Sequence, residues 1–264
     1  MSKRVTISTL DAMKASGDKF VMITAYDATF ARLASEAGAE TILVGDSLGM
    51  VFQRPASTIP VSLDAMAYHT ECVARARPHS LIVADLPFMS FSNSDDTLHA
   101  STRLMQAGAQ MVKLEGGTWL SDSIHRLVER GVPVCAHLGL TPQSVNVFGG
   151  YRVQGRTPKE AKSILADAVE IQDAGASLLV LECVPADLAA DISSKLDIPV
   201  IGIGAGSGTD AQVLVLHDML GMTESAPKFV QNFMDGAPSI QAALKAFVDA
   251  VKSGAYPQEE HTYS

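Results

Sequence analysis

The chain has 264 residues, of which 47% are hydrophobic and 19% charged, so it can bury a large core and lacks the composition of a disordered protein. Its formal net charge of −9 argues against nucleic acid or an anionic membrane surface as a partner and leaves a small molecule as the expected ligand. Cys72, Cys135 and Cys183 are too scattered for a disulfide framework or a zinc site, and no stretch is typical of a signal peptide or a transmembrane helix, so we expect a cytoplasmic protein.

Short apolar runs rich in Val, Ile and Leu recur along the chain, and helical segments that end near a Gly lie between them. We expect strands near 20–25, 41–45, 81–85, 110–114, 132–136, 177–182, 198–203 and 213–217. Amphipathic helices are expected at about 27–38, 62–77, 94–108, 119–130, 158–174 and 185–196, with weaker helical segments after the last two strands. This order predicts the α/β class and a single (β/α)8 barrel. An open doubly wound sheet is the alternative, but no phosphate-binding Gly fingerprint follows the first strand.

No linker or low-complexity tract divides the chain, so one catalytic domain is expected to cover residues 1–264. The longest connection without an obvious element is 137–158, where Phe148 and Tyr151 flank paired glycines and indicate an ordered lid. The segment 238–264 is expected to form a helix at about 239–252, followed by a tail that is either flexible or covers a neighbouring part of the protein.

Polar residues follow or end most of the predicted strands, where barrel enzymes place their active sites. They are Asp27, Asp46, Ser47, Asp85, Lys113, Glu115, His137, Glu182, His217 and Asp218. Carboxylates dominate this set, which favours a hard divalent cation such as Mg²⁺ over zinc. Asp46 and Asp85 are the economical pair of ligands, with Glu115 close by, and the open positions would chelate an α-oxo acid.

Several of these residues also have a purely structural interpretation. An Asp after a strand often caps a helix, and we accept that role for Asp27. Asp46 and Asp85 interrupt buried apolar runs, where an unpaired charge is costly, and this favours function. Lys113 is expected to face the barrel interior on the same side as Glu115, as a structural ion pair or, the interpretation we favour, as a ligand for a substrate carboxylate or phosphate.

The remaining candidates lie on the later strands. Burial would raise the pKa of Glu182 and suit it to general-base work, although a buried acid paired with a neighbour is the alternative. His137 fits a structural histidine and a substrate-binding one equally well. We expect His217 and Asp218 to cap or pack at the last turn. The glycines of 202–210 resemble a phosphate cradle but lack the partners of a P-loop, so we interpret them as a tight turn that lines the pocket.

The motifs GDSLGM at 45–50, ADLPFM at 84–89, KLEGG at 113–117, HLGLTPQS at 137–144, FGGYRVQGR at 148–156, LECVP at 181–185, GIGAG at 202–206 and PKF at 227–229 together resemble the ketopantoate hydroxymethyltransferase family. The resemblance covers nearly the whole chain. It implies a barrel of the phosphoenolpyruvate/pyruvate type and a Mg²⁺-dependent (or similar divalent ion) transferase. Such an enzyme moves a hydroxymethyl group from 5,10-methylenetetrahydrofolate to 3-methyl-2-oxobutanoate through a Mg-stabilised enolate and forms ketopantoate for pantothenate biosynthesis. It also implies a large homo-oligomer, a decamer in bacterial members.

By motif match, the resemblance assigns a role to each strand-end residue. Asp46 and Asp85 would be metal ligands, with Glu115 in the metal shell. Ser47 and Lys113 would hold the substrate carboxylate, Glu182 would be the base, and His137 would help to orient the substrate. One stretch departs from the family pattern: Arg54-Pro55-Ala56 stands where a Gly and an acidic residue are expected, which affects the loop after the second strand.

The strand-end acids leave two other functions as alternatives. A relative of phosphoenolpyruvate mutase or isocitrate lyase would also use strand-end acids, but such enzymes usually carry a catalytic Cys in a KKCGH-like phrase that this sequence lacks. A catalytically silent barrel that binds a metabolite or scaffolds an assembly would not need the full set of strand-end acids.

Overall fold

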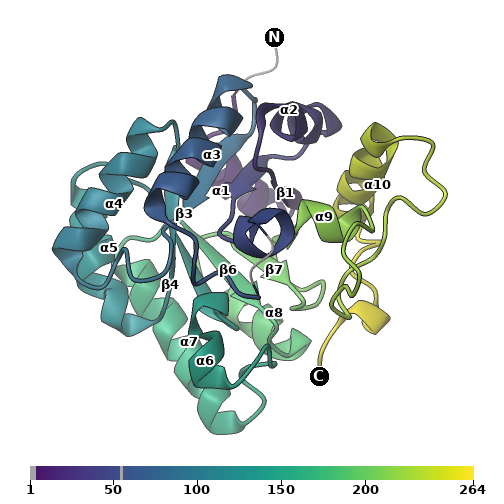
Figure 1. Cartoon of the computed structure of the whole chain (residues 1–264). Coiled ribbons are helices and arrows are strands. Elements are labelled where there is room, and N and C mark those ends of the chain that lie inside the picture. The colour runs from purple at the N-terminus through teal and green to yellow at the C-terminus, as the bar shows by residue number, and fades with distance from the viewer. Residues whose placement is uncertain (1–3, 54–55) are drawn as a thin grey trace.

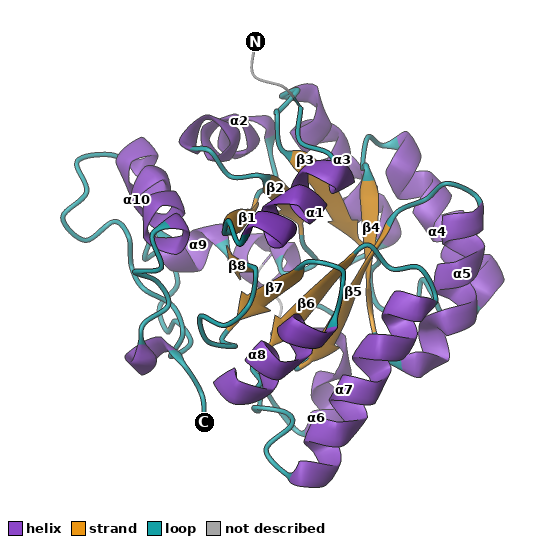
Figure 2. Ribbon diagram, turned by 180° about the vertical axis from the view of Figure 1, so that it is seen from behind, coloured by secondary structure: helices purple, strands orange, loops and turns teal. Residues whose placement is uncertain are grey.

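The computed structural model of the chain describes residues 4–53 and 56–264. Its strands are all parallel and pair in chain order, and the last pairs back with the first to close a barrel (Figure 2). They are β1 (Phe20–Thr24), β2 (Thr41–Val44), β3 (Leu81–Asp85), β4 (Met111–Glu115), β5 (Val134–Gly139), β6 (Leu178–Glu182), β7 (Val200–Ile203) and β8 (Ala211–Leu214). The predicted (β/α)8 barrel is therefore confirmed.

Helices surround the barrel and carry the chain from one strand to the next (Figure 1). The longer connecting helices are α2 (Ala28–Ala37), α3 (Leu63–Arg75), α4 (Ser94–Gln106), α5 (Ser121–Glu129), α7 (Pro158–Asp173) and α8 (Ala186–Lys195). They agree with the predicted ranges to within about two residues, because N-caps such as Asp27, Asn93 and Thr157 accept hydrogen bonds from first-turn amides and fix where several of them begin.

Shorter helices lie in the connections and at the two ends of the barrel. They are a π-helix η1 (Gly49–Gln53), the 3₁₀ turns η2 (Thr118–Leu120), η3 (Pro142–Ser144) and η4 (Glu259–His261), and the single turns α6 (Val145–Phe148) and α9 (Leu216–Met219). The long connection after β5 is therefore partly helical. Among the described residues no helix is both long and apolar enough to span a bilayer.

The first helix, α1 (Ile7–Ser16), was not predicted from the sequence. Only Leu10 of this helix is buried, so the apolar stripe that reveals an amphipathic helix is missing. A capping box between Thr6 and Thr9 begins the helix, and Gly17 ends it in the left-handed conformation. Local capping thus defines α1 where side-chain periodicity does not.

The connection between β7 and β8 corrects a second prediction. The expected helical segment after the seventh strand is wrong, because the loop 204–210 leads directly into β8. Gly204 and Gly206 take positive φ there and turn the chain tightly. The eighth strand consequently starts two residues earlier than expected, and residues 216 and 217, expected at its end, lie in the turn α9.

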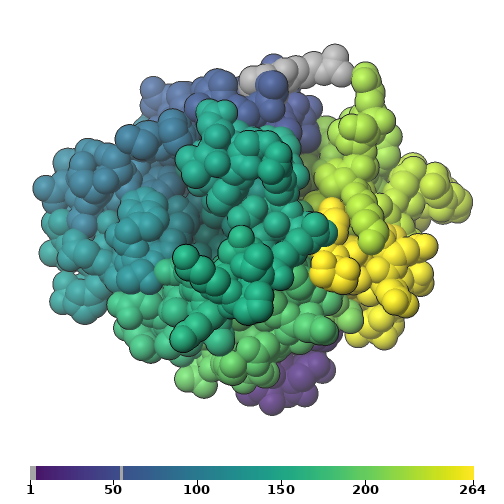
Figure 3. All heavy atoms as spheres, turned by 90° about the horizontal axis from the view of Figure 1, so that it is seen from below, coloured from purple at the N-terminus to yellow at the C-terminus, as the bar shows by residue number. Residues whose placement is uncertain are grey.

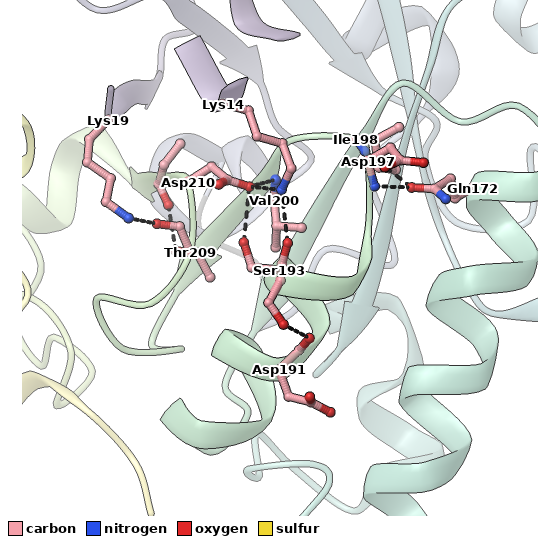
Figure 4. Close-up of polar contacts among 12 residues, drawn as sticks. Lys14, Lys19, Gln172, Asp191, Ser193, Asp197, Ile198, Val200, Thr209 and Asp210 are labelled. Atoms are coloured by element: carbon pink, nitrogen blue, oxygen red, sulfur yellow. Dashed lines mark hydrogen bonds and ion pairs between the residues drawn. The ribbon is translucent and has the colours of Figure 1, made fainter. Parts of the chain in front are cut away.

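Asp210 directly precedes β8 and organises the end of the barrel at which the strands begin. Its Oδ2 accepts hydrogen bonds from Lys14 Nζ of α1 (2.7 Å), from Ser193 Oγ of α8 (3.0 Å) and from the Val200 amide of β7 (2.8 Å), as Figure 4 shows. Polar residues at this end of a (β/α)8 barrel usually serve stability. This cluster fastens α1 and α8 to the barrel floor.

The C-terminal segment packs on its own barrel. Helix α10 (Ile240–Lys252) lies against α2 and β1, one residue shorter at its start than expected. Beyond it, Tyr256 Oη donates to the Phe229 carbonyl (2.5 Å), and Lys228 Nζ donates to the Thr262 carbonyl (2.8 Å). Figure 3 shows this tail in yellow beside the lime segment that precedes α10. The tail is thus a packed part of the fold.

Candidate active site

A cavity of about 870 Å³ opens at the C-terminal ends of the strands. It is lined by every residue that the sequence singled out for chemistry: Asp46, Ser47, Asp85, Lys113, Glu115, His137 and Glu182. Parallel strands bring these side chains together, since their carboxyl ends all meet at one rim. Asp27 does not line the cavity; its Oδ1 caps α2 by accepting from the Thr29 and Phe30 amides, as expected.

The two aspartates come from the ends of neighbouring strands, and both are buried, with 3% of each residue exposed. The main-chain amide of Asp46 donates to Asp85 Oδ2 at 3.0 Å. Asp85 Oδ1 lies 2.8 Å from Lys113 Nζ, its register partner on β4, although this oxygen has no partner in hydrogen-bond geometry. Asp85 therefore keeps a buried oxygen that can accept a further ligand.

His137 links the acids of the later strands. Its Nδ1 lies 3.2 Å from Lys113 Nζ and 3.4 Å from Glu115 Oε1, and its Nε2 lies 3.3 Å from Glu182 Oε2. A lysine ammonium can only donate, so Nδ1 accepts and the ring proton of neutral His137 sits on Nε2. This assignment, which follows from the contacts, directs an N–H toward Glu182.

Burial and mutual repulsion shift the titration of the acids. Burial raises the pKa of Asp46 well above its ordinary value, and the charges of Asp85 and Glu115 raise it further. Burial also raises the pKa of Glu115 to about 7. Burial raises the pKa of Glu182 as well, while the hydrogen bond from His137 opposes the shift. The raised pKa values of these acids indicate that the site buries more negative charge than its basic side chains balance.

Lys113 is the buried positive charge that Asp46, Asp85 and Glu115 share. Burial by itself would lower its pKa, but the carboxylates of Asp85, Glu115 and Asp46 outweigh burial and raise it. Burial and the Lys113 charge together lower the pKa of His137, which keeps the imidazole neutral. Three carboxylates thus share one ammonium group.

The donor set fits a hard divalent cation. All the anionic groups are carboxylates, and their excess charge favours a cation beside Asp46 and Asp85. In the part of the chain that the structure describes, no three His, Cys, Asp or Glu side chains form a ready-made cage for a metal. Mg²⁺ does not need one, because it commonly uses one or two carboxylates and fills its other positions with water or substrate.

The structure adds residues that the sequence did not single out. Tyr26 follows β1, and its Oη lies 2.9 Å from Ser47 Oγ. Gln143 of η3 donates hydrogen bonds to the carboxylates of Asp46 and Glu115. His217 packs against Tyr26 and Asp218 accepts from Thr223 Oγ1, as their expected packing role implies, and both also line the cavity. The search for polar residues at strand ends did not single out Tyr26, which follows β1, and could not find Gln143, which lies in a connection.

The predicted lid lies over the cavity. Tyr151 and Arg152 line it, and Tyr151 Oη donates to Met50 Sδ at 3.3 Å from across the opening. The glycines after β7 serve a turn, since a side chain at Gly204 would collide with Phe229. Arg54 and Pro55, which depart from the family pattern, lie outside the described residues.

Comparisons with known proteins identify the family to which the chain is similar. The sequence model described as ketopantoate hydroxymethyltransferase matches residues 4–259. The chain is 58% identical over 262 residues to 3-methyl-2-oxobutanoate hydroxymethyltransferase 2 of Pseudomonas entomophila and 57% identical to 3-methyl-2-oxobutanoate hydroxymethyltransferase of Pseudomonas putida; each match covers 98% of both chains.

Solved structures share the fold at low sequence identity. A phosphonopyruvate hydrolase in complex with oxalate and Mg²⁺ has a TM-score of 0.61 and 15% identity, and the match covers 97% of this chain and 93% of the other. For 2,3-dimethylmalate lyase, a member of the PEP mutase/isocitrate lyase superfamily, the TM-score is 0.60 with 14% identity and coverage of 95% and 98%. At this identity the likeness confirms the barrel type alone.

Proposed function

The chain belongs to the ketopantoate hydroxymethyltransferase family, and we propose that it transfers a hydroxymethyl group from 5,10-methylenetetrahydrofolate to 3-methyl-2-oxobutanoate, which yields 2-dehydropantoate for pantothenate biosynthesis. The observation that carries the proposal is the shared cavity: the Asp46 and Asp85 pair and Glu182 face the same space, with Lys113 and His137 between them. A cavity that offers cation ligands on one side and a general base on the other suits an α-oxo acid.

Lys113 and Ser47 anchor the substrate carboxylate. The Lys113 ammonium is buried and charged, and Ser47 Oγ is held by Tyr26 Oη at 2.9 Å. A charged donor and a fixed hydroxyl define one orientation of a bound acid and present one face of its C3 carbon.

Asp46 and Asp85, with Glu115 in the surrounding shell, would hold a magnesium or similar divalent ion. When bound, such an ion would polarise the keto and carboxylate oxygens of the substrate and acidify its C3–H bond. Asp46 and Asp85 supply the two carboxylates that Mg²⁺ commonly takes. The buried oxygen Asp85 Oδ1 points to the same use.

Glu182 removes the C3 proton. Burial raises its pKa, which makes the carboxylate a stronger base, and the Nε2–H of His137 faces one of its oxygens at an N···O distance of 3.3 Å. The C3 carbon then forms a bond to the one-carbon unit of the folate, the bond between that unit and the folate nitrogen breaks, and water supplies the hydroxyl oxygen. The cytoplasmic location expected from the sequence and the decamer implied by the resemblance stay predictions.

A label-transfer experiment tests the reaction. The protein is incubated with Mg²⁺, 3-methyl-2-oxobutanoate and donor that carries ¹³C in its methylene group, and the product is analysed by mass spectrometry. The proposal predicts 2-dehydropantoate one mass unit heavier, and none from Asp46→Asn or without the donor. Cleavage of a carbon–carbon bond, or binding of the acid without product, would contradict it.

A further inference from the structure

Gln143 contacts the acid cluster from outside the strand ends. It lies in η3, between β5 and the lid, and only 6% of the residue is exposed. Its Nε2 donates to Asp46 Oδ2 at 2.8 Å and to the Leu86 carbonyl at 2.9 Å, and its main-chain amide donates to Glu115 Oε2 at 3.0 Å. One residue thus binds two acids and the backbone next to the third, Asp85.

The contacts use the full donor capacity of this side chain. A carboxamide nitrogen carries two hydrogens, and here each has one acceptor, so the amide cannot rotate without losing a buried hydrogen bond. The Leu86 carbonyl is fixed by its place directly after β3, and its own amide donates to the Lys113 carbonyl at 2.9 Å. Gln143 therefore sets the Asp46 carboxylate against a rigid part of the barrel.

From these contacts we propose that Gln143 is a positioning residue for the cation site: it holds Asp46 Oδ2 and Glu115 Oε2 so that Asp46 presents its other oxygen beside Asp85. A neutral amide suits this task, because it orients a carboxylate without adding a positive charge that would compete with a cation. The inference rests on the proposed function only in taking Asp46 and Asp85 as the cation ligands. Hydrogen-bond partners of metal ligands typically change metal affinity about 10–100-fold when they are lost.

The competing explanation is that Gln143 only fastens η3 to the barrel. Gln154 offers a control, because it lies in the same connection, is half-buried, and donates through Nε2 to a backbone carbonyl, that of Arg152 at 2.9 Å. Among the described residues its hydrogen-bond partners include no acid. Gln→Met removes the amide at either site and keeps the length of the side chain. A fastening role predicts similar effects at the two sites; a positioning role does not.

The test measures binding of Mn²⁺ without substrate, by the loss of the free-ion electron paramagnetic resonance signal, together with the thermal midpoint in EDTA. We expect Gln143→Met to weaken Mn²⁺ binding at least about tenfold and Gln154→Met to leave it within about twofold of the wild type. The rate of C3 proton exchange should approach the wild-type value at saturating Mn²⁺, because the base and the anchors are intact.

A second variant covers the case in which Gln143→Met does not fold. Gln143→Asn keeps a carboxamide and withdraws it by one methylene, which breaks the Asp46 contact with a smaller loss of packing, and it should weaken Mn²⁺ binding in the same direction. Wild-type affinity in the folded Gln143 variants, or an equal loss in Gln154→Met, would overturn the proposal. A wild-type protein that binds Mn²⁺ but transfers no hydroxymethyl group would refute the proposed reaction and leave this role of Gln143 in place.

Discussion

The main-chain amide of Asp46 donates a hydrogen bond to Asp85 Oδ2 at 3.0 Å, and this bond joins the acids at the ends of β2 and β3. Neither acid is placed by its side chain alone: Gln143 holds the Asp46 carboxylate, and Lys113 faces the other oxygen of Asp85. The pair is therefore organised before any cation arrives, which is what a site of defined geometry requires.

Removal of Lys113 tests the charge balance of the cavity. Lys113→Met would leave Asp85 and Glu115 without their buried counter-charge, and breaking such an arrangement typically costs about 3–5 kcal/mol. The free energy of unfolding, measured in EDTA at pH 8, should fall by that order. Lys195→Met removes an exposed ion pair with Asp191 and should cost below about 0.5 kcal/mol. Equal small losses in both variants would show that Lys113 is not needed to balance the acids.

The pKa of Glu115 makes the metal-free protein less stable at high pH. The folded-state pKa of about 7 lies above the model value of 4.5, so the folded protein binds this proton more tightly than the unfolded chain does. The contribution of Glu115 to stability should be constant below pH 4.5, fall by roughly 3 kcal/mol between pH 4.5 and 7, and then level off. The raised pKa values of Asp46 and Glu182 add to the fall in the same direction.

Denaturation curves in EDTA at several pH values, for the wild type, Glu115→Gln and Glu129→Gln, measure this dependence. Gln resembles the protonated acid, so Glu115→Gln should lose the part of the fall that Glu115 causes, while the exposed Glu129→Gln should keep all of it. A fall of the same size in Glu115→Gln would assign the pH dependence to other groups.

Tyr26 is expected to act on substrate affinity through Ser47. Tyr26→Phe removes the hydroxyl that contacts Ser47 Oγ, and a hydrogen bond of this kind is worth about 0.5–1.5 kcal/mol, or roughly a 2–10-fold rise in KM. Because neither the base nor the acid pair is touched, kcat should change little. The exposed Tyr68→Phe serves as the control. A drop in kcat at unchanged KM would contradict this role.

Gly139 allows β5 to pass close to Glu182. Its φ is +89°, and a side chain there would collide with the Glu182 carbonyl oxygen. Gly131 also has a positive φ, of +79°, but faces open space. Gly131→Ala should cost about 1–2 kcal/mol for the backbone alone, and Gly139→Ala about 1–3 kcal/mol more because of the collision. Thermal midpoints of the two variants measure the difference; equal shifts would mean that the collision is relieved without cost.

The barrel could be predicted because each strand is a short apolar run and most helices carry an apolar stripe. The prediction failed where those signals are absent: α1 buries only Leu10, and the loop after β7 has glycines where a helix was expected. Strand-end position alone was enough to find Asp46, Asp85 and Glu182, because the fold brings all strand ends to one rim.

The rest of the site depends on contacts between distant segments. Gln143 lies 97 residues from Asp46 in the chain, and no local pattern reveals that its amide reaches a carboxylate. Tyr26 is an uncharged residue next to a capping Asp27, so its contact with Ser47 is visible only in three dimensions. His217 lines the cavity because α9 turns at the end of β8; the sequence places it at a strand end but does not show which way its side chain faces.

The central claim is that Glu182 removes the C3 proton of 3-methyl-2-oxobutanoate with the help of a divalent ion at Asp46 and Asp85. The most direct measurement is exchange of that proton in D₂O, followed by NMR, with and without Mg²⁺, for the wild type and Glu182→Gln. The account predicts exchange that needs Mg²⁺ and is lost in Glu182→Gln while Mg²⁺ still binds. No exchange by the folded, metal-loaded wild type even with a folate analogue present, or undiminished exchange by Glu182→Gln, would contradict it.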